Sequence, residues 1–293
     1  YNGEFSNVFG RLNLGLEAVF TSPNYTINFF GYGNETENPN TNGQDLSLDY
    51  NRVKLRTLRF APSFIKKGQL GSEVKLKLVY ESVEVEQTEN RFINGFYNSN
   101  NIQTTNNFLG AELSYFFKNA DNEAYPTLGF IADFKLGYRN NLDNNTNMGY
   151  FIPSIGIDYK LDSYGKLVLA SKVKGHITYG NNYEFYQAAS IGASNGLRGY
   201  RNQRFTGKHA YYQLTDLRYM FSKLKTGLLP INLGVYGGFD YGRVWLSNDN
   251  SNVWHNSYGG GVFVVAAELF TINTSLFNSD DGLRFALALG LNF

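Results

Sequence analysis

Hydrophobic and polar residues alternate along most of the 293-residue chain, in segments long enough to form β-strands. Successive side chains of a strand point to opposite faces, so this alternation gives each strand one apolar and one polar face. The pattern predicts about 13 strands. They span 8–20, 25–32, 48–61, 70–85, 108–118, 127–139, 149–161, 166–179, 211–221, 231–246, 258–267, 269–276 and 283–293.

Short turns and longer polar loops alternate between these segments. Turns are expected at 21–24 and 62–69, and polar loops at 33–44, 87–105 and 140–147. One strand changes phase: Val53 and Leu55 share a face, whereas Leu58 and Phe60 share the other. An inserted residue would cause such a change, so we expect a β-bulge near Arg56–Thr57.

The apolar face of so many strands needs a cover, and no segment has the pattern of a helix that could supply one. A soluble sheet of this size must pack against another layer. In lipid the apolar face needs no cover, and closure into a barrel removes the sheet edges. Tyrosines at strand ends fit the aromatic girdles of such barrels; they are Tyr25, Tyr80, Tyr138, Tyr159 and Tyr179. The pattern predicts an all-β fold: a single transmembrane antiparallel β-barrel domain over 1–293, in the outer membrane of a Gram-negative bacterium.

The composition is compatible with a membrane barrel, because strands and not helices would cross the membrane. A mean hydropathy of −0.34 is typical of a soluble protein, but a transmembrane strand needs only about 9–11 residues with every second one apolar. The 22 Tyr, 24 Phe and 31 Gly residues favour a long twisted sheet. A formal net charge of +1 gives no reason to expect nucleic acid as a partner, and the lack of cysteine excludes disulfides and thiolate metal sites. No cofactor or metal site is predicted.

The stretch 185–221 differs from the rest of the chain. It carries Arg198, Arg201 and Arg204 in a polar loop, followed by a strand in which Asp216 lies opposite the apolar face. Asp240 has the same inward phase in the next strand. We expect the loop 181–210 to be extracellular and to fold back into the barrel lumen. The alternative is that Arg198 is an ordinary solvated cation.

Several motifs carry a family resemblance. GASNGLRGY (192–200), Arg204-Phe205 with Gly207, Asp216-Leu-Arg218, GGFDYGRVW (237–245), SYGGGV (257–262) and the terminal Phe293 follow one another in this order. Together they resemble the bacterial surface antigen superfamily of outer-membrane barrels, which includes the outer-membrane protein assembly factor and the two-partner secretion transporters. FFGYGNET (29–36) and VWHNSYGGG (253–261) are most similar to the barrel fused to a metallophosphoesterase in Bacteroidota.

The resemblance implies roles for particular residues. Arg198 would reach into the lumen and pair with Asp216 and Asp240, because a guanidinium can donate to two carboxylates at once. Gly196, Leu197, Gly199 and Tyr200 would form the loop motif around it, and Leu289, Leu291 and Phe293 a C-terminal assembly signal. Gly196 and Gly199 would permit a positive φ or a close approach to the wall. Gly259, Gly260 and Gly261 would leave room for the inserted loop.

The sequence is compatible with three functions. The chain could be the membrane part of a metallophosphoesterase fusion that anchors a periplasmic domain, an outer-membrane protein insertase or secretion transporter, or a passive diffusion pore. The expected partners are outer-membrane lipids including lipopolysaccharide, the outer-membrane assembly machinery, and a fused or associated periplasmic domain. An odd strand count further predicts that one or three strands upstream of Tyr1 complete the barrel to 14 or 16.

Two further sequence patterns bear on chemistry. Gly192, Ser194 and Gly196 match a G-x-S-x-G nucleophile motif, but no helix follows and no triad partners are evident, so no catalytic residue is predicted. Lys172, Lys174 and His176 form a basic row on the polar face of one strand. Such a row could favour anions in a pore, although charge in a lumen is commonly only solvated.

Overall fold

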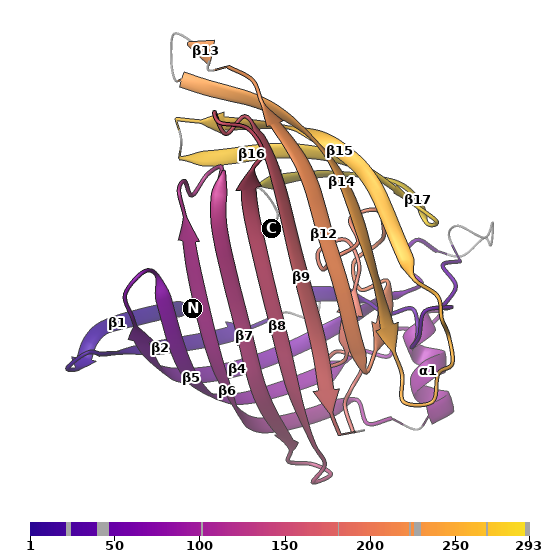
Figure 1. Cartoon of the computed structure of the whole chain (residues 1–293). Helices are drawn as coiled ribbons and strands as arrows, with labels where there is room; N and C mark the ends of the chain where they lie inside the picture. The colour runs from indigo at the N-terminus through magenta and orange to yellow at the C-terminus, as the bar shows by residue number, and fades with distance from the viewer. Residues whose placement is uncertain are drawn as a thin grey trace.

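A computed structural model of the chain describes residues 1–21, 25–39, 47–100, 102–180, 182–222, 224–225, 230–267 and 269–290. One antiparallel sheet curves round on itself through thirteen consecutive strands (Figure 1). These are β1 (Asn2–Phe9), β2 (Leu12–Phe20), β4 (Arg52–Lys67), β5 (Ser72–Val85), β6 (Thr105–Ala120), β7 (Leu128–Asn141), β8 (Asn147–Lys160), β9 (Leu167–Tyr179), β12 (His209–Met220), β14 (Pro230–Trp245), β15 (His255–Ala266), β16 (Phe270–Ser279) and β17 (Gly282–Leu289). Among the described residues, no pairing joins β1 to β17.

In the part of the chain that the structure describes, four short strands and one helix lie beside this path. β3 (Tyr25–Asn28) pairs with β4, and β13 (Leu224–Lys225) pairs with β14. β10 (Ala189–Ile191) and β11 (Phe205–Gly207) form a separate two-stranded sheet. α1 (Phe92–Asn100) lies between β5 and β6. No helix in the described part of the chain is both long and apolar enough to cross a membrane.

The two faces of the curved sheet have opposite chemistry, as the alternation predicts. Large apolar residues of the outer face are exposed, among them Leu76, Leu113, Leu136, Ile157 and Leu276. The inner face buries polar and charged residues, among them Asn13, Ser63, Arg139, Asp158 and Ser275. All five end-of-strand tyrosines named above are exposed. Four of them lie on the outer face, whereas Tyr25 pairs with the inward-pointing Leu55. The all-β class and the antiparallel barrel are therefore confirmed.

The number of strands matches the prediction, but the first three strands were divided wrongly. The predicted first strand 8–20 contains the tight turn at Gly10–Arg11, which separates β1 from β2. The turn predicted at 21–24 falls largely on residues 22–24, which lie outside the described residues. The strands on either side of it, β2 and β3, both run antiparallel to β4. Division of the predicted first strand into β1 and β2 adds one strand to the sheet path, and β3 lies off that path, so the path still has thirteen strands. A positive φ of 65° at Gly10 permits the turn that the alternation concealed.

The predicted bulge near Arg56–Thr57 is wrong, because β4 is continuous from Arg52 to Lys67 and keeps one register with β5 on either side of these residues. On its other side, β4 pairs with β2 as far as Leu58 and with β3 from Leu55, so Arg56 and Thr57 separate the two pairings. β4 also runs through most of the turn predicted at 62–69, and the chain turns at residues 68–71 instead.

The phase change in β4 has a different cause, which is a change of surroundings. Val53 and Leu55 point inward and are buried, whereas Leu58 and Phe60 point outward and are exposed. Inside the barrel, the end that carries α1 is filled with apolar side chains. Outside it, the same end carries ion pairs between β4 and residues 84–86, such as Arg56–Glu84 at 3.0 Å. The apolar side of the wall therefore switches from outside to inside near this end.

We call this end of the barrel the loop end. The region 87–105, expected to be a polar loop, contains α1, whose Ile93 and Tyr97 are buried. They pack with Phe29 and Phe185, whose ring centroids lie 4.6 Å apart. Aromatic residues scattered through Asn-rich sequence thus meet in one cluster, although no single segment has enough of them to predict it. This cluster fills the lumen at the loop end.

The opposite end, which we call the turn end, is also obstructed. The connection between β6 and β7 carries Tyr125, whose ring stacks on that of Phe263 in β15 at 5.3 Å between centroids. The Thr271 hydroxyl of β16 donates a hydrogen bond of 2.6 Å to the Ala124 carbonyl. Since β6–β7 and β15–β16 are far apart along the sheet path, this connection crosses the interior.

Candidate functional site

A long inserted segment, residues 182–208 between β9 and β12, lies against the inner face of the barrel wall. The loop predicted at 181–210 is slightly shorter than expected because β12 begins at His209, and residue 181 is outside the described residues. Its apolar residues are buried against apolar positions of β12 and β14. This cluster comprises Ala189, Ile191, Leu197, Tyr200 and Phe205 of the segment with Ala210, Tyr212, Leu214 and Val244 of the wall.

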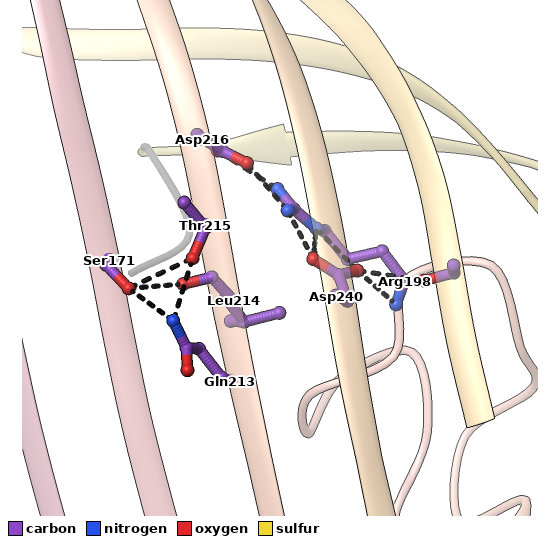
Figure 2. Close-up of polar contacts among 8 residues, drawn as sticks. Ser171, Arg198, Gln213, Leu214, Thr215, Asp216 and Asp240 are labelled. Atoms are coloured by element: carbon purple, nitrogen blue, oxygen red, sulfur yellow. Dashed lines mark hydrogen bonds and ion pairs between the residues drawn. The ribbon is translucent and has the colours of Figure 1, made fainter. Parts of the chain in front are cut away.

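Arg198 of the inserted segment contacts two carboxylates of the wall, Asp216 in β12 and Asp240 in β14 (Figure 2). Its Nη1 and Nη2 donate to the two oxygens of Asp216 over 3.1 and 2.6 Å. Its Nε and Nη2 donate to Oδ1 of Asp240 over 3.1 and 2.5 Å. We call this three-residue arrangement the arginine clamp. The planar fork of a guanidinium allows one side chain to hold both strands.

The clamp is almost closed to solvent. The side chains of Asp216 and Asp240 are 3% and 0% exposed, and that of Arg198 is 12% exposed. The guanidinium carbon lies 4.1 Å from the ring centre of Phe277, and the Ser257 hydroxyl donates to Asp240 over 2.9 Å. Burial alone would lower the pKa of Arg198, but the hydrogen bonds to Asp240 and Asp216 outweigh it and raise the pKa. The arginine is therefore permanently charged, as two buried carboxylates require.

Three glycines around the clamp lie where a side chain would collide with its neighbours, and one of them also has a positive φ. Gly196 has a φ of +104°, and a Cβ there would lie 2.2 Å from the ring of Tyr212. Gly199 has an ordinary φ, but a Cβ would lie 2.8 Å from that of Ser257. Gly238, which the sequence did not single out, makes room for the clamp, since its Cβ would lie 2.3 Å from the Asp216 carboxylate.

The role expected for Gly259, Gly260 and Gly261 is not what the structure shows. A Cβ at Gly259 would collide with the Leu276 carbonyl at 2.1 Å, and one at Gly261 with the Thr274 carbonyl at 2.0 Å. Their neighbours are thus mainly the backbones of adjacent strands. These glycines permit close approach within the wall and leave no space for the inserted segment.

The other residues of the loop motif are core residues of the segment. Leu197 is fully buried in the cluster that joins the segment to β12. Tyr200 is also buried, and its hydroxyl lies 3.4 Å from the Asp280 carboxylate. Of the three residues expected to form a C-terminal signal, Leu289 is an exposed residue of β17, and Leu291 and Phe293 lie outside the described residues.

Arg204, to which the sequence gave no partner, forms a second tether. Its Nε donates to Asp281 over 2.8 Å, and its Nη1 and Nη2 donate to the hydroxyl and carbonyl of Thr36 over 2.8 and 2.7 Å. It thereby connects the inserted segment to the turn between β16 and β17 and to residues 29–39. Arg201 makes a more exposed contact, donating to the Leu48 carbonyl over 3.3 Å.

Residues 29–39 form a further crossing that the sequence did not predict, since most of them were assigned to a polar loop. Gly33 donates its N–H to the Thr206 carbonyl over 2.8 Å. Asn34 exchanges two hydrogen bonds with the backbone of Val244 in β14, of 2.8 and 3.0 Å. The buried side-chain amide of Asn34 thus pairs with the backbone of β14 as a neighbouring strand would, on the side of the barrel away from β2 and β4.

A second buried ion pair lies beside the clamp. Arg218 of β12 donates to Asp158 of β8 over 3.1 Å, and the two side chains are 1% and 5% exposed. The sequence places both residues on inward faces but gives no reason to pair them, because β9 lies between their strands. The arrangement as a whole can fix an internal segment to the wall. No group of three or more His, Asp or Glu side chains in the described part of the chain is placed to hold a metal ion.

Comparisons with known proteins add one finding. No family model matches the chain, and no curated protein matches it. Among solved structures, the crystal structure of BamA from Haemophilus ducreyi lacking POTRA domains 1-3 matches 98% of this chain with a TM-score of 0.69 and 13% sequence identity. The chain spans 60% of the length of that structure. At this level of identity the likeness concerns the fold, which is that of a BamA-type barrel.

Proposed function

We propose that this chain is the membrane-embedded barrel of a Gram-negative outer-membrane protein of the surface antigen type, with an internal segment held by the arginine clamp. The observation that carries the proposal is the contact of Arg198 with both Asp216 and Asp240 inside a barrel of this fold. The exposed apolar outer face supports placement in lipid, where only closed barrels and helices satisfy every backbone group. Lipids including lipopolysaccharide would then surround the wall.

Within this class, we propose that the barrel anchors a periplasmic domain, as the resemblance to the metallophosphoesterase fusions implies. Obstruction of both ends supports an anchor over an open diffusion pore. The cluster around Phe29 fills the loop end, and Tyr125 packs against Phe263 at the turn end. The fused or associated domain would carry any phosphoesterase activity. Insertion of the barrel would depend on the outer-membrane assembly machinery.

A second function, insertion or secretion of other proteins, is favoured by the likeness to a BamA barrel. That likeness extends through 98% of this chain but supports the fold alone, because sequence identity is 13%. An insertase would need the barrel wall or its contents to move, whereas an anchor needs only a stable wall. The proposals therefore differ in what the purified barrel does to other proteins.

Two measurements on the reconstituted chain separate these functions. The first is steady conductance in planar bilayers, and the second is the folding rate of an unrelated small outer-membrane barrel in liposomes containing this chain. An anchor predicts little steady conductance and no acceleration. The matched control is Arg198→Ala, which frees the inserted segment and is expected to give fluctuating conductance. Steady pore conductance of the unmodified chain would contradict the anchor, and accelerated folding would establish the insertase instead.

A further inference from the structure

Lys174 and His176 of the basic row on β9 border a cavity of about 250 Å³. The rest of its lining comes from the inserted segment, Ile152 of β8, and Ala210 and Tyr212 of β12. The polar side chains that line it are those of Lys174, His176, Tyr186, Gln187, Ser190, Asn195 and Tyr212. We call this cavity the Lys174 chamber. Lys172, two residues earlier on the same face, lines a neighbouring cavity with Arg198 and Ser194.

Lys174 is held in place but keeps most of its hydrogen-bonding capacity. Its Nζ donates to Oδ1 of Asn195 over 3.3 Å and lies 6.0 Å from the ring centre of Tyr212. Asn195 is itself fixed, because its Nδ2 donates to the Ser190 carbonyl over 2.6 Å and its Oδ1 accepts from the Tyr212 hydroxyl over 3.1 Å. An ammonium group has three donor hydrogens, so two remain for a ligand.

Two further side chains bring nitrogen atoms to the same chamber. Gln187 accepts a hydrogen bond from the Glu184 N–H through Oε1 over 3.1 Å, which leaves its Nε2 as a donor. This Nε2 and the Nε2 of His176 are buried and have no hydrogen-bond partner among the described protein atoms. Buried polar atoms are normally satisfied, so unpartnered atoms beside a cavity indicate a polar occupant.

The charges around the Lys174 chamber indicate which kind of ligand it could bind. No aspartate or glutamate among the described residues lines it. Glu81 and Glu112 line an adjoining cavity that shares His176 and Gln187, and they are paired with Arg59 and Arg139 at 3.9 and 3.8 Å. The nearest carboxylate in register with Lys174 is Asp133 of β7, which is paired with Lys135 at 3.3 Å. A lysine, an amide nitrogen and an imidazole facing one space suit an anion with several acceptor oxygens.

We infer that the Lys174 chamber binds a small oxyanion of the phosphate type. Lys174 supplies the charge, Gln187 Nε2 and His176 Nε2–H supply further donors, and Asn195 orients the lysine. A tetrahedral oxyanion presents acceptors in several directions at once, as these donors require. The proposed donors all come from β9 and the inserted segment, so the site does not depend on whether the barrel serves as an anchor or an insertase.

The test is calorimetric titration of the purified chain, folded in detergent micelles, with inorganic phosphate in a chloride background. Saturable binding is expected. Lys174→Met is expected to weaken it at least about tenfold, because it removes a charge-assisted hydrogen bond. Gln187→Leu keeps every charge and is expected to weaken it about threefold or more. Glycerol 3-phosphate is the second probe, and its binding would indicate a phosphomonoester, whereas binding of phosphate alone indicates the free anion.

Lys172→Met is the matched control. It removes the same charge from the same face of β9, but outside the chamber, so binding is expected to stay within about twofold. The inference is overturned if the unmodified chain shows no saturable phosphate binding. It is also overturned if Lys172→Met weakens binding as much as Lys174→Met, since binding would then depend only on the general charge of the lumen. Unchanged thermal unfolding of each variant shows that loss of binding is not loss of fold.

Discussion

The backbone N–H of Arg198 donates to Oδ2 of Asp240 over 3.0 Å, and the Nε of the same arginine donates to that oxygen over 3.0 Å. One buried carboxylate of β14 therefore fixes both the main chain and the side chain of the inserted segment. The second carboxylate, Asp216, receives the outer end of the guanidinium. Removing the side chain would leave the backbone bond but would deprive both acids of their cation.

Arg198→Ala is expected to destabilise the barrel by about 3–5 kcal/mol, because it leaves buried carboxylates without a partner. The measurement is equilibrium unfolding of the reconstituted chain in urea. Arg198→Lys should recover part of the loss, since an ammonium restores the charge but not the fork that spans both acids. The control, Arg201→Ala, removes an equally charged but more exposed side chain and should change stability by less than about 0.5 kcal/mol. Equal losses for Arg198→Ala and Arg201→Ala would exclude the clamp.

Gly196→Ala is expected to prevent correct packing of the inserted segment. The new methyl group would meet the ring of Tyr212 at 2.2 Å, and the φ of +104° is strained for alanine. Gly95→Ala is the control: nothing lies within 4 Å of its Cβ position, and it lies within α1. That change should stabilise the helix by about 0.5–1 kcal/mol. Thermal unfolding of both variants tests the pair, and the prediction fails if Gly196→Ala unfolds at the temperature of the unmodified chain.

Arg204→Gln is expected to release residues 29–39. It removes hydrogen bonds from a charged donor to Asp281 and Thr36, which contribute about 1.5–3 kcal/mol each. Glu35 and Glu37 are exposed, so a glutamyl endopeptidase can report opening of this stretch. Cleavage should accelerate at least about tenfold, since 1.4 kcal/mol corresponds to a factor of ten. Arg201→Gln serves as the control, and equal cleavage rates in the two variants would contradict the tether.

Phe29→Ala is expected to loosen the cluster at the loop end without opening the barrel wall. Phe29 is fully buried and contacts Phe92, Phe96 and Phe185, so its loss should cost about 3–5 kcal/mol. Trypsin cleavage after Arg91, next to α1, measures the release. Phe64→Ala removes an outward-facing ring of β4 and should leave the cleavage rate unchanged. If Phe64→Ala accelerates cleavage as much, the effect is not specific to the cluster.

The barrel wall was predictable because each strand obeys a period-two rule that can be read locally. The inward phases of Asp216 and Asp240 follow from that rule, which is why their side chains could be placed before their partner was known. The rule fails where the surroundings reverse. Val53 and Leu55 follow the same backbone alternation as Leu58 and Phe60, but they face an apolar interior at the loop end, so the sequence alone suggested a bulge.

The contacts between the irregular segments inside the barrel were much harder to predict than the wall. Phe29, Ile93, Tyr97 and Phe185 come from three separate segments, each polar on average, and their packing is a property of the assembled fold. The tether of Arg204 to Asp281 joins residues 77 positions apart. A turn hidden in regular alternation, at Gly10–Arg11, also carried little signal beyond the glycine. Long-range contacts between irregular segments have no periodicity to reveal them.

The central claim is that the arginine clamp holds residues 182–208 against the inner wall. Hydrogen exchange followed by mass spectrometry tests it most directly, by comparing the unmodified chain with Arg198→Gln and with Arg201→Gln. The clamp predicts slow exchange in peptides from 189–207 of the unmodified chain, and at least about tenfold faster exchange in Arg198→Gln, with β7 and β8 unchanged. Arg201→Gln should behave as the unmodified chain. The same exchange rates across 189–207 in all three proteins would contradict the claim.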